Sequence, residues 1–192
     1  MPEKNQAALE FLLTRRSRPA KTLQPPVPDA DTLRLLLTAA ARTPDHGKLE
    51  PWRFIVLQGD AFVRLSTLVA TRGVELGKSD EDITKGQSQF DMGHLAVVVV
   101  ESPKPSDKIP QIEQTYSAGA VCLALLNAAL SAGWGANWLS GWPSHDPAFC
   151  ATGLGLKPHE RVAGIIHIGT EKSAPPDRPR PNIEEITEWH SA

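Results

Sequence analysis

A cluster of arginines around one serine follows the first apolar stretch of the chain. The run Arg15-Arg16-Ser17-Arg18 comes directly after residues 5–14, whose apolar positions recur at helical spacing. Guanidinium forks and a hydroxyl suit phosphate oxygens, because they donate several charge-assisted hydrogen bonds to them. The same residues would also serve as a cationic helix end, which the dipole of the preceding helix favours. Spacing alone leaves both interpretations open.

Three further segments place basic, aromatic or glycine residues in connections. Residues 42–52 combine proline, histidine and tryptophan in a stiff turn, which also fits an ordinary helix-to-strand connection. Residues 135–142 (GANWLSGW) have glycines that let a flat ligand approach the backbone, or they form a buried strand end. Residues 178–180 (RPR) offer two more guanidinium groups, or a solvated tail. Each segment alone is a weak functional signal.

Several familiar catalytic motifs are missing from the sequence. It contains no G-x-S-x-G nucleophile elbow and no G-x-x-x-x-G-K-[ST] phosphate loop. Gly133-Trp134-Gly135 is predicted to follow a helix and precede a strand, whereas a dinucleotide fingerprint follows a strand and precedes a helix. The six histidines form no i, i+4 pair and no H-E-x-x-H, so we expect no metal site.

Helices and strands are expected to alternate along the chain in an α/β or α+β arrangement with one layered core. The second helix begins at Asp29 or Asp31, and a short later helix is capped near Ser144 or Asp146. The polar segment 78–91 has little pattern and is predicted to be a mobile flap. The predicted helices cover about residues 5–14, 60–77 and 114–132, and the second helix runs from its cap at Asp29 or Asp31 until Pro44 ends it. The predicted strands cover 52–57, 94–101, 136–139 and 162–168.

The predicted helix 114–132 is apolar on almost every face and rich in alanine. Such a helix belongs in the middle of a protein or at an obligate interface, because no face of it suits water. Cys122 lies in this run, and we expect it to be a buried, inert thiol.

Composition predicts an ordinary globular protein with one domain over residues 1–192. The net charge of −2 gives no reason to expect nucleic acid as a partner. Two cysteines are too few for a disulfide framework. The N-terminus carries its basic residues after its apolar ones, the reverse of a secretory signal, and no apolar stretch approaches about 20 residues. We therefore expect a cytoplasmic protein without membrane segments.

Taken together and in this order, the segments resemble the nitroreductase superfamily, and most closely its short, single-domain bacterial branch. The likeness runs from about Ala7 to Glu188. Its marks are R-R-S at 15–17, R-x-P-D-H with P-W within 42–52, S-A-G at 117–119 and G-x-x-W-x-S-G at 135–141. The resemblance implies an α+β fold, a three-layer α/β sandwich with a mixed central sheet flanked by helices, built as an obligate homodimer.

The resemblance also implies FMN at the dimer interface, NAD(P)H as co-substrate, and ping-pong transfer to a small flat acceptor such as a nitroaromatic or quinone. It assigns cofactor-binding residues and no catalytic side chain, because the cofactor carries the chemistry. These residues are Arg15, Arg16 and Ser17 for the phosphate and ribityl chain; Arg180 for the phosphate; Arg42 and His46 from the partner subunit; and Trp138, Leu139 and Ser140 along the isoalloxazine, largely through backbone. A donor toward N1 and O2 of the ring would be Arg16, Arg18 or Lys21.

Two positions depart from the family pattern. Residue 139 is leucine where close relatives have the arginine of W-R-S, so a charge near the ring is lost. Residue 50 is glutamate where glutamine is usual before Pro-Trp. The first departure keeps open a flavin-binding protein with little turnover, serving storage, sensing or flavin breakdown. A flavin-free interaction module, in which the arginines are solvated helix ends, is a third hypothesis.

Overall fold

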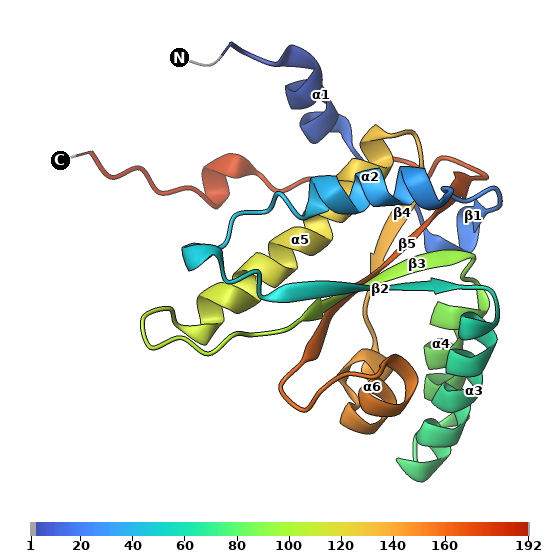
Figure 1. Ribbon diagram of the computed structural model, residues 1–192. Helices are drawn as coiled ribbons and strands as arrows, with labels where there is room; N and C mark the ends of the chain where they lie inside the picture. Colours follow the sequence, from blue (N-terminus) through green and yellow to red (C-terminus); the bar gives the residue numbers. More distant parts are fainter. Residues whose placement is uncertain (1–2, 192) are drawn as a thin grey trace.

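The computed structural model describes residues 3–191, which form a central sheet between two layers of helices (Figure 1). The strands within this range are β1 (Leu23–Gln24), β2 (Trp52–Gln58), β3 (Leu95–Glu101), β4 (Gly135–Leu139) and β5 (Arg161–Glu171). The α-helices are α1 (Gln6–Thr14), α2 (Ala30–Ala40), α3 (Asp60–Glu75), α4 (Asp80–Asp91), α5 (Gln111–Ser131) and α6 (Pro147–Leu154). Short 3-10 turns lie at η1 (Ala20–Thr22), η2 (His46–Lys48), η3 (Trp142–His145) and η4 (Ile183–Glu185).

The buried strand β3 divides the core into two halves. Side chains alternate across a strand, so Val97 and Val99 face one layer while Val98 and Val100 face the other. The first half of the core is completed by α2 and α5, and the second by α3, α4 and α6. The α+β sandwich expected from the resemblance is confirmed.

The predicted mixed sheet is wrong, because every strand pair described in residues 3–191 is antiparallel. The order is β1-β5-β3-β2, with β4 also paired to β5. The α3–α4 hairpin returns the chain to the end of the sheet that it left, so Gln58 pairs with Leu95. The long helix α5 connects β3 to β4, which are not neighbours in the sheet. Strand β5 lies between them and pairs with both.

The segment predicted to be a mobile flap is a regular helix instead. Residues 80–91 form the regular helix α4, whose N-terminus is capped by the Ser79 hydroxyl accepting from Asp82 N at 3.2 Å. The helix packs on α3, where Gly73 leaves room for Ile83. Its apolar stripe consists of little more than Ile83, Gly86 and Phe90, which is too narrow to stand out in a polar sequence.

Other local predictions are confirmed. Of the two aspartates considered for the start of α2, Asp29 is the cap and accepts from Thr32 N at 2.8 Å. Asp146 rather than Ser144 caps α6. The Cys122 thiol is fully buried, and burial raises its pKa to about 12, which keeps it protonated. Within residues 3–191, no helix combines the length and apolar character needed to cross a membrane.

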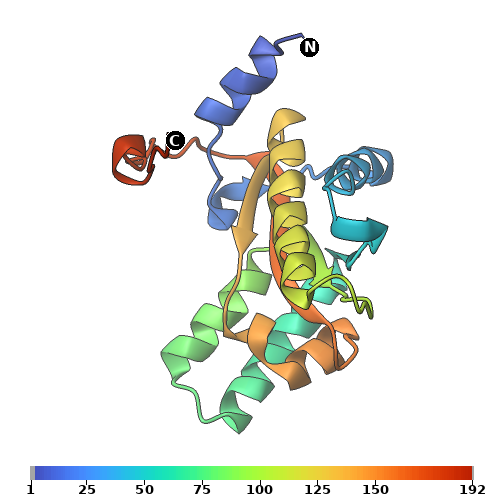
Figure 2. The same cartoon turned by 90° about the vertical axis from the view of Figure 1, so that its left-hand side faces the viewer.

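Several apolar side chains remain on the outside of the chain. Helix α5 exposes Ile112, Tyr116 and Leu123, although its opposite side is packed in the core. Helix α1 projects from the sandwich, and the C-terminal segment also extends away from it (Figures 1 and 2). Both carry exposed apolar residues, namely Leu9, Leu12 and Leu13 on α1 and Ile183, Ile186 and Trp189 near the C-terminus.

The buried histidine of β5 generates a prediction on stability and pH. His167 is 2% exposed, and burial lowers its pKa to about 4. The folded value lies below the unfolded value of about 6.5, so the unfolded chain takes up the proton first as the pH falls. Stability is therefore complete above pH of about 6.5 and is lost toward pH of about 4, by roughly 2 kcal/mol at pH 5 from this residue. Urea unfolding at pH 7 and pH 5 measures the loss. The variant His167→Gln should lose less between these pH values, and an unchanged difference would contradict the assignment.

Candidate functional site

Two segments far apart in the sequence meet beyond the end of α1. Arg180 Nη2 donates to the carbonyl oxygen of Arg15 at 3.5 Å, and Arg16 Nε donates to that of Pro176 at 3.4 Å. Arg15 Nη2 donates to Ser17 Oγ at 3.0 Å. The structure therefore brings together Arg180 and the R-R-S run.

This cluster has an excess of positive charge. The pKa of Arg15 is lowered first by burial and then by the neighbouring cations Arg180, Arg16 and Arg18. Arg15 Nε is buried and finds no hydrogen-bond partner within residues 3–191. A buried donor without a partner is costly, as is the crowding of like charges, and a phosphate dianion would relieve both. The donor set thus fits the phosphate of FMN.

A slot lies next to this cluster along the outer edge of β4. The first part of that edge is covered, because Arg18 N donates to Ala136 O at 2.8 Å and Asn137 Nδ2 donates to Arg18 O at 2.7 Å. Beyond it, Leu139 and Ser140 line a cavity of about 350 Å³. Its other lining residues come from the segment after the arginines and from α4: Pro19, Ala20, Lys21, Lys85, Ser88, Gln89, Met92 and Asn137.

The structure narrows the choice of a cationic donor for the ring. Lys21 lines the slot. Arg18 is already engaged, since its Nε lies 3.0 Å from Glu171 Oε2. Arg16 donates to backbone carbonyls on the side of the cluster that faces the C-terminal segment. Of the three candidates, Lys21 is the one positioned in the slot.

Helix α4 contributes slot residues that sequence reasoning missed. Lys85, Ser88 and Gln89 face the cavity, and Gln89 Oε1 is buried without a hydrogen-bond partner among the described residues. The Gln89 amide packs against the backbone of Gly141, where any Cβ would collide with it. The signal available in the sequence was the Ser79-to-Asp82 cap, which marks the start of a helix rather than a flap.

Trp138 is separated from the slot by the alternation of β4. It shares a face with Ala136, which lies in the core between the sheet and α5, and its indole packs over Gly164 of β5. Leu139 faces the other way, toward the slot. Trp138 can therefore contribute backbone, but not its ring, to a ligand in that slot.

Arg42 and His46 lie elsewhere on the same chain. His46 Nδ1 is 2.7 Å from Glu113 Oε2 of α5, and both residues line a shallow depression with Tyr116. Arg42 is exposed in the loop that precedes η2. Neither residue contacts the slot of its own chain.

The loop that carries these two residues is rigid. The Asp45 carboxylate accepts from Leu49 N at 2.8 Å and from Glu50 N at 3.1 Å. These bonds hold a backbone that has positive φ at Gly47, Lys48 and Glu50, a conformation costly for the latter two residues. The exposed Glu50 side chain belongs to this strained turn.

The S-A-G helix and the P-W segment are joined by hydrogen bonds. Trp52 Nε1 donates to Ser117 Oγ at 3.1 Å, and Ser117 Oγ donates to Pro44 O at 3.0 Å. Two motifs separated by 65 residues thus fix the same loop onto α5. No cluster of three metal-ligating side chains occurs within residues 3–191.

Comparison with known proteins agrees with this geometry. A model of the nitroreductase family matches residues 12–170. YdjA of Escherichia coli (strain K12), provisionally named an NAD(P)H nitroreductase, is 32% identical over 163 residues, covering 85% of this chain and 87% of its own. A similarly named protein of Haemophilus influenzae is 34% identical over 164 residues, covering 85% and 88%.

Solved structures support the same assignment. A nitroreductase-like family protein from Bacillus cereus has a TM-score of 0.81 at 26% identity, with complete coverage of both chains. A nitroreductase-type structure from Desulfovibrio desulfuricans in complex with FMN has a TM-score of 0.73 at 19% identity, covering 99% of this chain and 100% of its own, and supports the fold alone. The arginine cluster, the slot at the edge of β4 and the family match together place the chain in the nitroreductase family.

Proposed function

We propose that this chain is an FMN-dependent NAD(P)H oxidoreductase that works as a homodimer and reduces small flat acceptors such as nitroaromatics or quinones in a ping-pong cycle. The observation that carries the proposal is the pairing of an arginine cluster that has an excess of positive charge with a slot lined by Lys21 and Leu139. FMN has the matching shape, with a dianionic phosphate at one end and a flat ring at the other. Relatives carry NAD(P)H nitroreductase names, which supports the nicotinamide co-substrate.

The chain's own residues bind and orient the cofactor. Arg15, Arg16 and Arg180 hold the phosphate, and Ser17 supplies a hydroxyl beside it. When bound, FMN supplies two-electron chemistry between NAD(P)H and the acceptor. The ammonium group of Lys21 favours negative charge in the slot, and therefore favours reduced over oxidised flavin.

The positions of Arg42 and His46 support the proposed homodimer. Arg42 and His46 lie away from their own slot, so they can serve a flavin only if it belongs to the partner. The exposed apolar side chains Ile112, Tyr116 and Leu123 lie on the same helix that carries Glu113, the partner of His46. Burial of such a stripe against a second copy would stabilise the dimer and bring the two loops to the slots.

A flavin-binding protein with little turnover is the second candidate. It is favoured by Leu139, which places an aliphatic side chain in the slot where close relatives carry an arginine. A slot with one fewer cation stabilises reduced flavin less, and so slows its formation by NAD(P)H.

The visible spectrum of the purified protein tests both candidates. We expect a yellow protein that loses its oxidised-flavin absorption on anaerobic mixing with NADPH or NADH, and regains it when a quinone is added. Persistent colour after mixing would support the binding protein instead. A colourless protein that fails to take up added FMN would overturn both.

The arginine cluster yields a prediction on cofactor affinity. Arg15→Ala should weaken FMN binding about 10- to 100-fold, because a charge-assisted hydrogen bond contributes about 1.5–3 kcal/mol. Fluorescence titration of the flavin-free protein measures the dissociation constant. Arg34→Ala is a matched control, since Arg34 is exposed on α2 and pairs with Asp31. Equal FMN affinities of the two variants would remove Arg15 from the phosphate site.

Position 139 yields a prediction on flavin reduction. Leu139→Arg adds a cation to the slot and should tighten binding of reduced relative to oxidised FMN about tenfold, which is ~1.4 kcal/mol. Spectroelectrochemical titration would then show a higher midpoint potential and faster reduction by NADPH. The neutral variant Leu139→Met should leave the potential unchanged. A potential that rises equally in both variants would show that shape, rather than charge, is responsible.

A further inference from the structure

The hydroxyl at the end of the slot is bonded to a histidine that the proposed function does not use. Ser140 Oγ lies 3.1 Å from His145 Nε2. Ser140 lines the slot, whereas His145 lines a separate cavity of about 540 Å³ between α5, β5 and η3, and the two cavities share no lining residue. Both residues are exposed, so the pair is a polar link at the surface between the slot and the neighbouring cavity.

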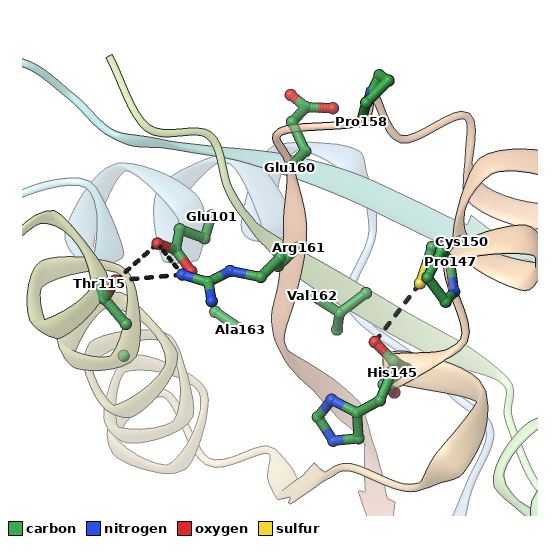
Figure 3. A pocket seen from close by; sticks show the side chains of 12 residues that line it. Glu101, Thr115, His145, Pro147, Cys150, Pro158, Glu160, Arg161, Val162 and Ala163 are labelled. Carbon is green, nitrogen blue, oxygen red and sulfur yellow. Dashed lines mark hydrogen bonds and ion pairs between the residues drawn. The ribbon is translucent and has the colours of Figure 1, made fainter. Parts of the chain in front are cut away.

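On the far side of the second cavity, the polar side chains of Arg161, Glu101 and Thr115 are hydrogen-bonded to one another. Arg161 Nη2 lies 2.8 Å from Glu101 Oε1, and Thr115 Oγ1 donates to the same oxygen at 2.7 Å. Figure 3 shows this network on one side of the cavity and the His145 imidazole on the other. Arg161, the arginine among the described residues that line this cavity, is thus paired, and the side-chain contact of the His145 imidazole is with Ser140.

The turn that carries His145 is held tightly. Ser144 N donates to Gly141 O at 3.0 Å, and Asp146 N donates to Pro143 O at 3.3 Å. Trp142 Nε1 donates to Asp82 O of α4 at 3.0 Å. Backbone bonds on both sides of His145 therefore fix the position of its Cα relative to Ser140.

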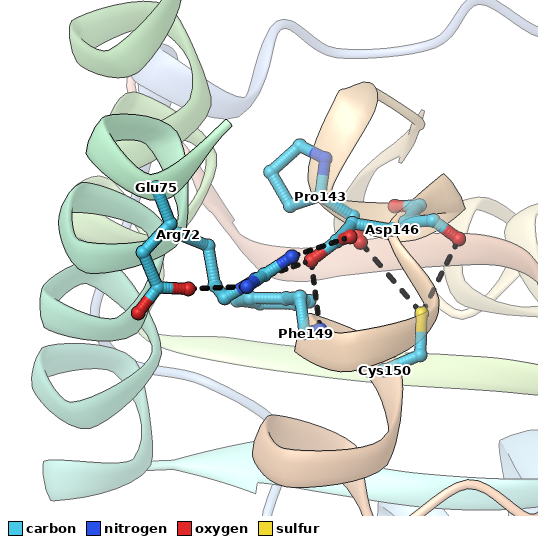
Figure 4. A network of polar contacts seen from close by, with 7 residues as sticks. Arg72, Glu75, Pro143, Asp146, Phe149 and Cys150 are labelled. Atoms are coloured by element: carbon cyan, nitrogen blue, oxygen red, sulfur yellow. Dashed lines mark hydrogen bonds and ion pairs between the residues drawn. The ribbon is translucent and has the colours of Figure 1, made fainter. Parts of the chain in front are cut away.

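Asp146, the next residue, connects this turn to two helices. Arg72 of α3 donates to its carboxylate through Nε at 2.9 Å and through Nη2 at 3.1 Å, and Phe149 N donates to it at 2.9 Å (Figure 4). The bond to Arg72 holds the pKa of Asp146 below its usual value, so the pair stays charged. The Cys150 thiol also approaches the carbonyl oxygens of Pro143 and Ser144, at 3.6 and 3.5 Å.

Ser140 contributes a hydroxyl to the β4 end of the slot, and His145 is its side-chain partner. Its neighbours Leu139 and Met92 are apolar, and the amide of Asn137 donates to Arg18 O. A hydroxyl can donate or accept, and its direction depends on which proton the imidazole nitrogen carries. His145 therefore decides whether Ser140 presents a proton or a lone pair to a ligand in the slot.

We propose that His145 is a positioning residue that orients the Ser140 hydroxyl and thereby sets the relative affinity of the slot for oxidised and reduced flavin. The inference rests on the proposed function, because it takes FMN as the occupant of the slot. Reduced flavin is richer in electrons than oxidised flavin, so a hydroxyl of fixed direction distinguishes the two.

A double-mutant cycle over His145→Ala and Ser140→Ala tests the proposal. The measured quantities are the FMN dissociation constant and the midpoint potential of the bound flavin. Loss of one neutral hydrogen bond predicts a change of about fivefold in the ratio of the two affinities. That ratio corresponds to about 20 mV for a two-electron couple. With alanine already at position 140, His145→Ala should cause no further change.

Two further variants sharpen the test. His145→Gln retains a hydrogen-bonding group and should restore much of the original potential. His159→Ala removes an exposed histidine that lines neither the slot nor the cavity beside it, and should change nothing. An equal shift from His145→Ala in both backgrounds would overturn the proposal.

The bond itself is measurable without flavin. The ¹⁵N chemical shift of His145 Nε2 in the flavin-free protein should change on Ser140→Ala, and an unchanged shift would also overturn the proposal. Failure of the unmodified protein to bind FMN would count instead against the proposed function, since the nitrogen shift does not depend on the cofactor.

Discussion

The pairing of β4 with β5 fixes the position of the β4 residues that line the slot. Five residues of β4 are in register with β5, from Gly135 opposite Gly169 to Leu139 opposite Ile165. One edge of β4 is thereby paired with β5, and Arg18 is hydrogen-bonded to the start of the other edge. What remains is a short stretch at Leu139 and Ser140, where backbone and side chains are free to meet a ligand. Gly164 is essential to this arrangement, because its missing side chain makes room for Trp138.

The charge balance of the arginine cluster beside the slot also supports ligand binding there. Arg15 and Arg180 approach each other with Asp177 as the nearest acid, at 3.0 Å from Arg180, while Glu171 is engaged by Arg18. Elsewhere the buried Glu160 carboxylate is fully paired: Arg53 donates two bonds of 2.8 Å to it, which lower the pKa of Glu160 to about 2. By contrast, Arg15 Nε is buried without a hydrogen-bond partner within residues 3–191, which supports the proposed phosphate site over a purely structural cluster.

Much of the fold could be predicted from the sequence, because its strongest patterns are local. The buried strand at Leu95–Glu101 and the alanine-rich α5 carry their periodicity openly. The apolar stripe of α4 is too narrow to reveal a helix in the sequence. The sequence therefore predicts a flap where this helix lies, and it gives no sign that Gln89 lines the slot. The antiparallel direction of β2 and β3 could not be predicted from local sequence patterns either, since it depends on the α3–α4 hairpin returning the chain to Leu95. The arginine run stands out in the sequence because phosphate recognition favours a particular residue type, whereas the face occupied by Trp138 depends on the register of β4.

Placing the proposed flavin at an interface has a thermodynamic consequence. If the loop with Arg42 and His46 closes over the partner's slot, cofactor and second subunit each bind better when the other is present. Hydrogen bonds between α5 and the loop provide a structural basis for such coupling. Ser117 holds the loop through Pro44 and Trp52, and the same helix exposes Tyr116 on its outer side. A shift of α5 against a partner would therefore move the loop with it. The His46–Glu113 bond would keep the imidazole in place until the partner's slot is reached. In the proposed dimer, α5 would be at once a core element, an interface and the support of the loop, which would account for its being apolar on nearly every face.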